Sequence, residues 1–222
     1  MLESIGIVAF GLSGVLVARR RCLDLYGTFV LALVTALGGG VIRDLVLGIV
    51  PPANLVSPRL ILLAAAPALL VAIPGVDALS RSPWIHRVLP LARTLLIADA
   101  IGLAAFTVSG VMIAEATIGG AGTTAPATLA VFAGVITATG GGMIRDLLAG
   151  VVPAVLRREI YAVASFLGAV AVVAAERLGA TAPIGVGTGL SVTMLVRLGS
   201  HVLDIHLPAG AGCADRGDRV DR

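Results

Sequence analysis

One seventeen-residue segment occurs twice in this chain. TALGGGVIRDLVLGIVP at residues 35–51 matches TATGGGMIRDLLAGVVP at residues 137–153, and twelve of the 17 positions are identical. The chain is therefore an internal duplication, and its fold has to place two related halves around one core. A second match, at a shift of 96 rather than 102 residues, pairs Gly6, Phe10, Ser13 and Gly14 with Gly102, Phe106, Ser109 and Gly110.

The composition favours lipid rather than water as the surroundings of most of the chain. Hydrophobic residues make up 58% of the 222 residues and charged residues only 13%, and the mean hydropathy is +1.03. A soluble domain carries about 25% charged residues, which wet its surface. A helix that crosses a membrane needs about 20 consecutive apolar residues. Such stretches predict seven spans, at residues 2–18, 27–50, 59–76, 95–114, 126–152, 159–175 and 184–203.

The two copies of the repeated segment fall in the second and fifth of these spans. Each repeat, at about residues 3–76 and 95–175, then contains three spans. Because three is odd, the second repeat must enter the membrane from the opposite side, which makes an inverted-topology duplication. The sequence thus predicts an all-α membrane protein with a single transmembrane domain over residues 1–207. The span at 184–203 lies outside the repeat, and residues 208–222 are expected to form a disordered cytoplasmic tail.

The arginines predict how the chain is oriented. The chain has no lysine, and eleven of its 16 arginines fall in the loops and tail on one side of the predicted spans. Only Arg59 and Arg177 fall on the other side, and three arginines lie within spans. Positively charged loops stay in the cytoplasm. We therefore expect the N-terminus outside, with Glu3 marking the outer boundary of the first span, and the C-terminus in the cytoplasm.

Each repeated segment combines three glycines with an arginine–aspartate pair inside a span. A glycine in a helix costs about 1 kcal/mol relative to alanine, and a charge at the centre of a span costs about 2.5–3.5 kcal/mol. We expect the second and fifth helices to be kinked or broken at the glycine triplets, where they face each other and form one composite site. Its residues are Gly38, Gly39, Gly40, Arg43, Asp44, Gly140, Gly141, Gly142, Arg145 and Asp146, with Thr35 and Thr137 close by.

The sequence leaves two interpretations of the charged pairs open. They line a permeation path, or they are salt bridges that lock the two repeats together. Each arginine needs a partner, which is a neighbouring aspartate, a carbonyl freed by a break in the helix, or Asp99 at the start of the fourth span. Arg197 in the last span either pairs inward or extends to the membrane surface. The glycine triplets either break the helix or allow two helices to cross closely.

The remaining residues give little sign of chemistry. Cys22 and Cys213 are far apart and the three histidines are scattered, so neither a metal site nor a disulfide is expected. No arrangement of nucleophile and base indicates an enzyme, and no cofactor is expected. The sequence pI of about 9.5 comes from arginines in short loops. Those arginines indicate topology rather than a nucleic-acid surface.

Seven spans, an inverted three-plus-three repeat and paired GGGxxRDxxxG segments together resemble the trimeric intracellular cation (TRIC) channel family, specifically its bacterial and archaeal members. The resemblance covers about residues 3–205. It implies a homotrimer in the lipid of a prokaryotic plasma membrane, with a pore in each protomer lined largely by the second and fifth helices. It also implies that K⁺ and Na⁺ pass this pore, with the constriction near residues 38–44 and 140–146.

A monovalent cation channel is the function that these features favour. A secondary transporter of a small solute, such as a small amino acid, is the alternative, because inverted repeats with broken helices also occur in transporters. A membrane scaffold without transport is a third hypothesis. Arginines in a pore favour anions. The channel hypothesis therefore requires each guanidinium to be neutralised by Asp44, Asp146 or carbonyl oxygens, or to move as a gate.

Overall fold

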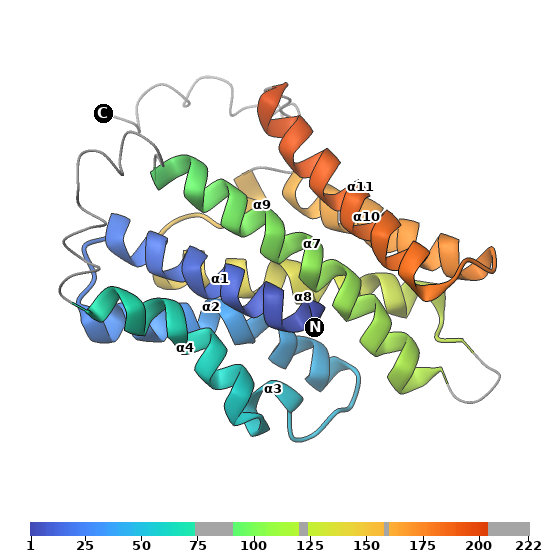
Figure 1. The fold of residues 1–222 in the computed structure, drawn as a ribbon, viewed down its shortest axis with the longest axis horizontal. Coiled ribbons are helices and arrows are strands. Elements are labelled where there is room, and N and C mark those ends of the chain that lie inside the picture. The colour runs from blue at the N-terminus through green and yellow to red at the C-terminus, as the bar shows by residue number, and fades with distance from the viewer. Residues whose placement is uncertain (74–90, 120–123, 158–159, 204–222) are drawn as a thin grey trace.

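The computed structural model of the chain is a bundle of α-helices (Figure 1). It describes residues 1–73, 91–119, 124–157 and 160–203. The all-α architecture predicted from the sequence is confirmed over these ranges. The helices are α1 (Leu2–Arg20), α2 (Leu25–Val46), α3 (Ala53–Val56), α4 (Pro58–Ala72), α7 (Leu91–Ile118), α8 (Ala127–Leu148), α9 (Ala154–Arg157), α10 (Ile160–Arg177) and α11 (Ala182–Val202).

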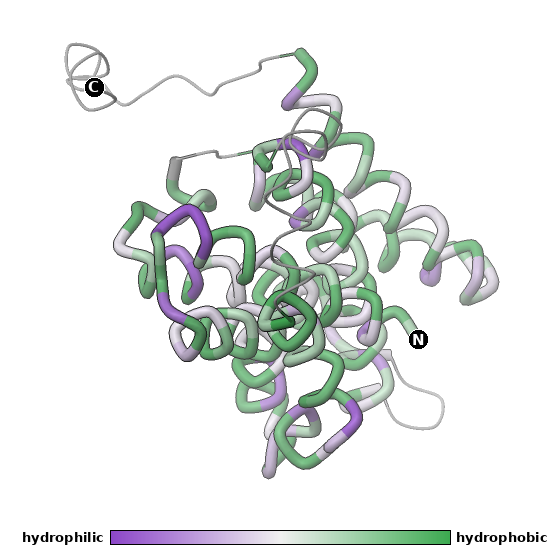
Figure 2. The backbone as a smooth tube through the Cα atoms, turned by 60° about the vertical axis from the view of Figure 1, so that its left-hand side comes forward, coloured by the Kyte–Doolittle hydropathy of each residue, from purple (hydrophilic) through white to green (hydrophobic). Residues whose placement is uncertain are grey.

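Six of the described helices are long and apolar enough to cross a membrane, namely α1, α2, α7, α8, α10 and α11. Helix α4 is apolar but has only 15 residues, and the predicted third span runs on into residues outside the described part. The tail predicted at 208–222 also lies outside the described residues. Figure 2 shows hydrophobic positions along most of the helices and hydrophilic positions gathered mainly at the turns. The chain is an all-helical membrane protein with six long apolar helices and several shorter ones.

The helices pack in pairs that follow the duplication. Helix α1 contacts α7, and α2 contacts α8, so equivalent helices of the two repeats meet. Helix α1 also packs on α2 and α4, as α7 packs on α8 and α10. Helix α11 has no equivalent in the first repeat. It packs on α10 and α7 at one side of the bundle, as Figure 1 shows.

Equivalent phenylalanines from the two repeats meet in the core between α1 and α7. The rings of Phe10 and Phe106 lie edge to face, with their centroids 5.1 Å apart. Two equivalent glycines make room for them: a methyl group at Gly102 would overlap the ring of Phe10, and one at Gly6 would lie 2.9 Å from the ring of Phe106. This contact between the two helices therefore follows the pairing of residues in the sequence repeat.

Of the kink or break expected at the glycine triplets, the break does not occur in the second and fifth spans. Helices α2 and α8 each continue as α-helix through the glycine triplet. The glycines instead let the two helices cross in backbone contact. A methyl group at Gly39 would overlap the carbonyl oxygen of Thr137, and one at Gly141 would overlap the carbonyl oxygen of Thr35. Close packing at this crossing offsets the low helix propensity of the triplets.

Candidate functional site

Each repeated segment ends its helix with the same hydrogen-bonded turn. At the end of α2, Gly48 adopts a left-handed φ of 74°, and the N–H of Ile49 donates to the carbonyl of Asp44 at 2.8 Å. The equivalent bond after α8 joins the N–H of Val151 to the carbonyl of Asp146 at 2.9 Å. This is the Schellman arrangement, which needs a glycine at the left-handed position. The spacing RDxxxG therefore places the arginine and the aspartate in the last turn of a continuous helix.

The ends of α2 and α8 are electrostatically favourable places for Arg43 and Arg145. Both lie in the last turn, where the partial negative charge of the unpaired carbonyls stabilises a guanidinium. Because the helices are unbroken, the triplets free no carbonyl groups to act as ligands.

Arg43 is fully buried and is held by two carboxylates. Its Nε and Nη2 donate to Oδ1 of Asp44 at 2.8 and 2.7 Å, and its Nη1 and Nη2 lie 3.2 Å from Oε1 of Glu3 on α1. The other oxygen of Asp44, Oδ2, accepts the backbone N–H of Ala53 at 2.8 Å, at the start of α3. Glu3 therefore does more than mark the boundary of the first span, because it is a counter-ion of a buried arginine.

Arg145 has the equivalent arrangement in the second repeat. Its Nε donates to Oδ1 of Asp146 at 2.8 Å, and its Nη1 donates to Oδ1 of Asp99 on α7 at 2.8 Å. Oδ2 of Asp146 accepts the N–H of Ala154 at 2.9 Å, at the start of α9. Nη1 of Arg145 also donates to the hydroxyl of Ser13, which belongs to the first repeat. We call the group around Arg43 the outer network and this group the inner network, after their predicted sides of the membrane.

The two networks lie on opposite sides of the α2–α8 crossing. Each arginine follows the first glycine of its triplet by five residues, which corresponds to about 7 Å along a helix. Helices α2 and α8 cross at their triplets, and the first repeat runs opposite to the second in an inverted duplication. The charged residues of the expected site therefore form two networks, one in each repeat. Among the described residues, the ion pairs of Arg43 and Arg145 each stay within one repeat.

The two threonines of the candidate site lie in the crossing itself. Thr35 and Thr137 are fully buried. Their hydroxyl groups donate to the backbone carbonyls one turn earlier, those of Leu31 and Ala133. Each hydroxyl proton is therefore engaged within its own helix, and only the oxygen lone pairs remain available to a solute.

Arg197 on α11 points inward and joins the inner network. Its Nη2 lies 3.9 Å from Oδ2 of Asp99, and its guanidinium carbon lies 4.7 Å from the centroid of the Tyr161 ring. Tyr161 and Asn54 are two further buried polar residues, and neither belongs to the site expected from the sequence. Each lies against the third glycine of a triplet, and their polar side-chain atoms have no hydrogen-bond partner within the described residues. Tyr161 carries no sequence signal of this role, whereas Glu3 could have been found as the residue that aligns with Asp99 at a shift of 96.

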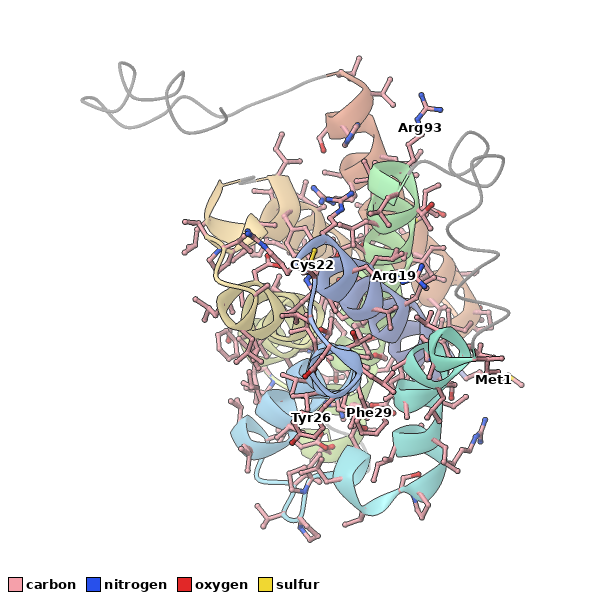
Figure 3. The ribbon with its side chains drawn as sticks, turned by 90° about the vertical axis from the view of Figure 1, so that its left-hand side faces the viewer. Met1, Arg19, Cys22, Tyr26, Phe29 and Arg93 are labelled. Carbon is pink, nitrogen blue, oxygen red and sulfur yellow. The ribbon has the colours of Figure 1, made fainter. Side chains whose placement is uncertain are left out.

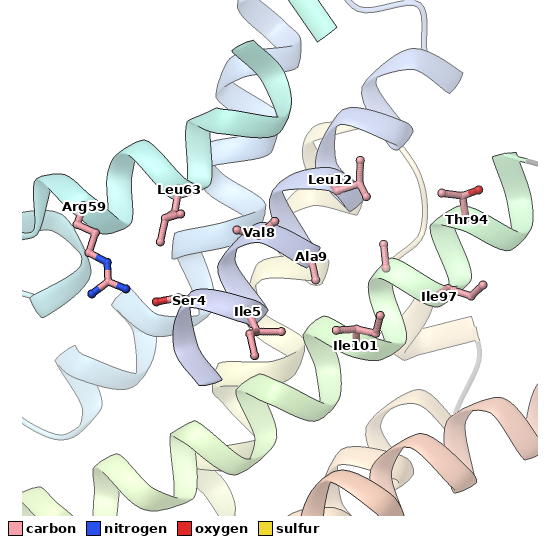
Figure 4. Close-up of a pocket in the computed structure, with 11 residues that line it drawn as sticks. Ser4, Ile5, Val8, Ala9, Leu12, Arg59, Leu63, Thr94, Ile97 and Ile101 are labelled. Atoms are coloured by element: carbon pink, nitrogen blue, oxygen red, sulfur yellow. The ribbon is translucent and has the colours of Figure 1, made fainter. Parts of the chain in front are cut away.

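A cavity of about 520 Å³ opens onto the inner network. A second cavity, the groove of about 610 Å³ in Figure 4, is lined mainly by apolar side chains. That groove runs between α1, α4 and α7, and Arg59 is its one charged lining residue. The inner cavity combines space with charge, and its charged lining is Arg20, Arg21, Asp99, Arg145, Asp146 and Arg197.

Proteins similar to this chain are bacterial membrane proteins. A family model described as "Glycine transporter" matches residues 1–74 and 96–177. A UPF0126 membrane protein of Vibrio cholerae is 36% identical over 95% of this chain and 82% of its own length. The inner membrane protein YadS of Escherichia coli is 37% identical over 95% of both chains. YvgT of Bacillus subtilis is 37% identical over 76% of each.

Solved structures with the same fold are TRIC channels. The TRIC orthologue from Rhodobacter sphaeroides matches with a TM-score of 0.78 and 38% identity over 92% of this chain and 97% of its own. A structure from work on conductance through TRIC cation channels matches with a TM-score of 0.77 and 34% identity, over 94% and 95% of the two chains. This chain belongs to the prokaryotic TRIC channel family. The UPF0126 proteins and the glycine-transporter model describe the same family.

Membership of the TRIC family confirms three predictions from the sequence. The resemblance drawn from the paired GGGxxRDxxxG segments is correct. The protein is a multi-pass protein of the bacterial inner membrane. It is also a member of a channel family rather than an enzyme family.

Proposed function

We propose that this TRIC-family protein is a channel for monovalent cations such as K⁺ and Na⁺, with one path in each protomer of a homotrimer. The observation that carries the proposal is the match to TRIC channel structures at 29–38% identity over at least 92% of the chain. The seven-span inverted arrangement, with the N-terminus outside, belongs to the same proposal. The pairing of α1 with α7 and of α2 with α8 supports it.

The buried networks explain how a path lined by arginines can admit cations. A lone arginine in a pore favours anions. Arg43, however, is within 3.2 Å of carboxylate oxygens of both Glu3 and Asp44. Two carboxylates against one guanidinium leave a net negative charge, so the local potential favours a cation. The need for neutralisation is therefore met by side-chain carboxylates rather than by freed carbonyls.

In the proposed path the two networks are separated by the α2–α8 crossing. The inner cavity, which includes Arg20 and Arg21 at the end of α1, forms the cytoplasmic mouth. The glycine triplets, with Thr35 and Thr137, form the narrow part. A movement of α2 against α8 at this glycine contact would change the width of the path. The networks around Arg43 and Arg145 flank the narrow part on its two sides.

Recording from purified protein in planar bilayers tests this proposal. We expect unitary currents across a K⁺ gradient, with a reversal potential that follows the cation gradient. Replacing Arg43 or Arg145 by alanine should change the unitary conductance or the gating of an intact trimer. Arg93→Ala is the matched control, because Arg93 is exposed at the start of α7 and points away from the bundle (Figure 3). Absence of unitary currents in the unmodified protein would overturn the proposal.

A glycine transporter is the second candidate, because the matching family model carries that description. A transporter would show saturable uptake of labelled glycine into liposomes, accelerated by glycine inside the vesicles. A channel would show no counterflow. Uptake of that kind without unitary currents would favour the transporter, and the absence of both activities would favour a scaffold.

A further inference from the structure

The two networks differ in charge because of a helix that lies outside the repeat. The outer network contains one arginine and two carboxylates, those of Glu3 and Asp44. The inner network contains the equivalent carboxylates of Asp99 and Asp146 but two arginines. The second arginine is Arg197 on α11. The ion pairs of the described residues therefore leave the outer network with a formal charge of −1 and the inner network neutral.

Arg197 is held less tightly than Arg145, although both guanidinium groups contact Asp99. Nη1 of Arg145 lies 2.8 Å from one oxygen of Asp99, whereas Nη2 of Arg197 lies 3.9 Å from the other. The Nε of Arg197 is buried and has no hydrogen-bond partner within the described residues. Its main neighbour is the face of the Tyr161 ring, which attracts a cation but supplies no hydrogen-bond acceptor. The charge of Arg197 is thus only partly balanced at close range.

Arg197 also lines the cavity of about 520 Å³ beside Asp99, Arg145 and Asp146. A cation that enters from this side meets the guanidinium of Arg197 next to the two carboxylates. The other titratable groups around the cavity are Arg20 and Arg21 on α1 and His201 on α11. Arg20 and Arg21 add positive charge and therefore act in the same direction as Arg197. His201 adds either a positive charge or none, so it does not oppose them.

We propose that Arg197 is a charge-controlling residue of the cation path: it lowers cation entry from the cytoplasmic side and makes the channel rectify inward. The proposal rests on the cation-channel function proposed above. Cations entering from outside meet the negative outer network, whereas cations entering from the cytoplasm meet a neutral inner network. A unit charge about 4–10 Å from an ion in water changes its local concentration about two- to fivefold. Removing Arg197 should therefore raise outward cation current about two- to fivefold and bring the inward-to-outward ratio towards one.

Inside-out patches from cells that express the chain test this proposal with known sidedness. Currents are compared at about 0.1 M and about 1 M KCl, because the screening length falls from about 10 Å to about 3 Å between them. Arg197→Gln should raise outward current and reduce rectification at the lower salt, and the difference from the unmodified protein should shrink at the higher salt. Arg197→Met provides an uncharged variant that keeps a long side chain over Tyr161. Arg197→Lys should retain the rectification, because it keeps the charge.

Arg93→Gln is the matched control for these recordings. It removes one positive charge from an exposed residue near the same end of α7, outside the cavity lining, and should leave rectification unchanged. The inference is wrong if Arg197→Gln and Arg197→Met show the same inward-to-outward current ratio as the unmodified protein. It is also wrong if Arg197→Lys loses rectification to the same extent as the two uncharged variants. In either case the cation-channel function stands. If the unmodified protein carries no cation current, both the channel function and this inference are wrong.

Discussion

Glu3 and Asp99 hold the two buried arginines from equivalent positions on α1 and α7. Oε1 of Glu3 lies 3.2 Å from Nη1 of Arg43, and Oδ1 of Asp99 lies 2.8 Å from Nη1 of Arg145. The two acids are 96 residues apart, the same shift that pairs Phe10 with Phe106. Each repeat therefore supplies its own counter-charge to its own arginine, and among the described residues the ion pairs of Arg43 and Arg145 stay within one repeat.

The two acids should differ in their contribution to stability. Asp99→Asn removes a charge from a buried pair and should lower the apparent free energy of unfolding by about 3–5 kcal/mol. Glu3→Gln should cost about 1 kcal/mol, because the Glu3 side chain is 24% exposed and its pair with Arg43 is longer. Thermal unfolding in detergent measures both. Asp24→Asn is the control, because Asp24 is the exposed N-cap of α2 and asparagine caps equally well. A larger loss for Glu3→Gln than for Asp99→Asn would contradict this prediction.

Alanine in the glycine triplets should separate α2 from α8. The methyl group in Gly39→Ala would overlap the carbonyl oxygen of Thr137, which belongs to the backbone and cannot rotate away. We expect Gly39→Ala and Gly141→Ala each to destabilise the protein by about 3 kcal/mol. Gly187→Ala in α11 is the control, because nothing lies within 4 Å of its Cβ position. That substitution should be neutral or slightly stabilising, since alanine is the better helix former. Equal melting temperatures for all three variants would show that the crossing tolerates side chains.

Loss of the Asp146 carboxylate should release the segment that follows α8. Oδ2 of Asp146 accepts the N–H of Ala154 at 2.9 Å. A hydrogen bond to a charged group contributes about 1.5–3 kcal/mol. Asp146→Ala should therefore raise the hydrogen-exchange rate at Ala154 by about tenfold or more. Asp146→Asn keeps an acceptor oxygen and should lose less protection. Unchanged exchange at Ala154 in Asp146→Ala would mean that other contacts hold this segment.

The proposed orientation can be tested with a natural cysteine. Cys22 is exposed at the end of α1, beside the arginine cluster predicted to face the cytoplasm. In a Cys213→Ser background, a membrane-impermeant maleimide should label Cys22 in inside-out vesicles and not in intact cells. Detergent-solubilised protein provides the positive control for reactivity. Labelling of Cys22 in intact cells would place the arginine cluster outside and reverse the proposed orientation.

The sequence shows that Arg43, Asp44, Arg145 and Asp146 fall within spans, but it does not show that they lie at the ends of continuous helices. Because glycine and charge are both costly within a span, the triplet Gly38–Gly40 followed by Arg43 and Asp44 favours a kink or a break, and a close helix crossing is the alternative that the sequence leaves open. The cost of glycine is offset by a partner helix, and the carbonyls of Thr35 and Thr137 against the opposite triplets are contacts that no single segment reveals. The glycine that does end α2 is Gly48, at the left-handed position of the terminal turn.

The sequence indicates which spans carry buried charges better than it indicates the residues that contact them, because those residues come from distant segments of the chain. Asp99 is a charge within a span, so the sequence indicates it as a partner of a buried arginine. Glu3 lies at the start of a span, where an acidic residue usually marks the membrane boundary. Nothing in the sequence distinguishes Tyr161 or Asn54, because a tyrosine in an apolar segment and an asparagine in a loop are ordinary residues. Their contacts with Gly142 and Gly40 exist only because α10 and α3 fold back onto the helix ends.

By itself the sequence determined that the chain is a duplicated, all-helical membrane protein of the TRIC family. Hydropathy, repeat spacing and the GGGxIRD signature depend only on the order of the residues and not on which residues meet in space. Only the tertiary structure decided that the triplets form a crossing, that the charged residues form two networks, and that Arg197 joins one of them. Those outcomes depend on which helix lies opposite each residue. The helix that lies opposite matters because a buried charge is stable only beside a counter-charge. A glycine triplet in a membrane helix is stable only where another helix packs closely against it.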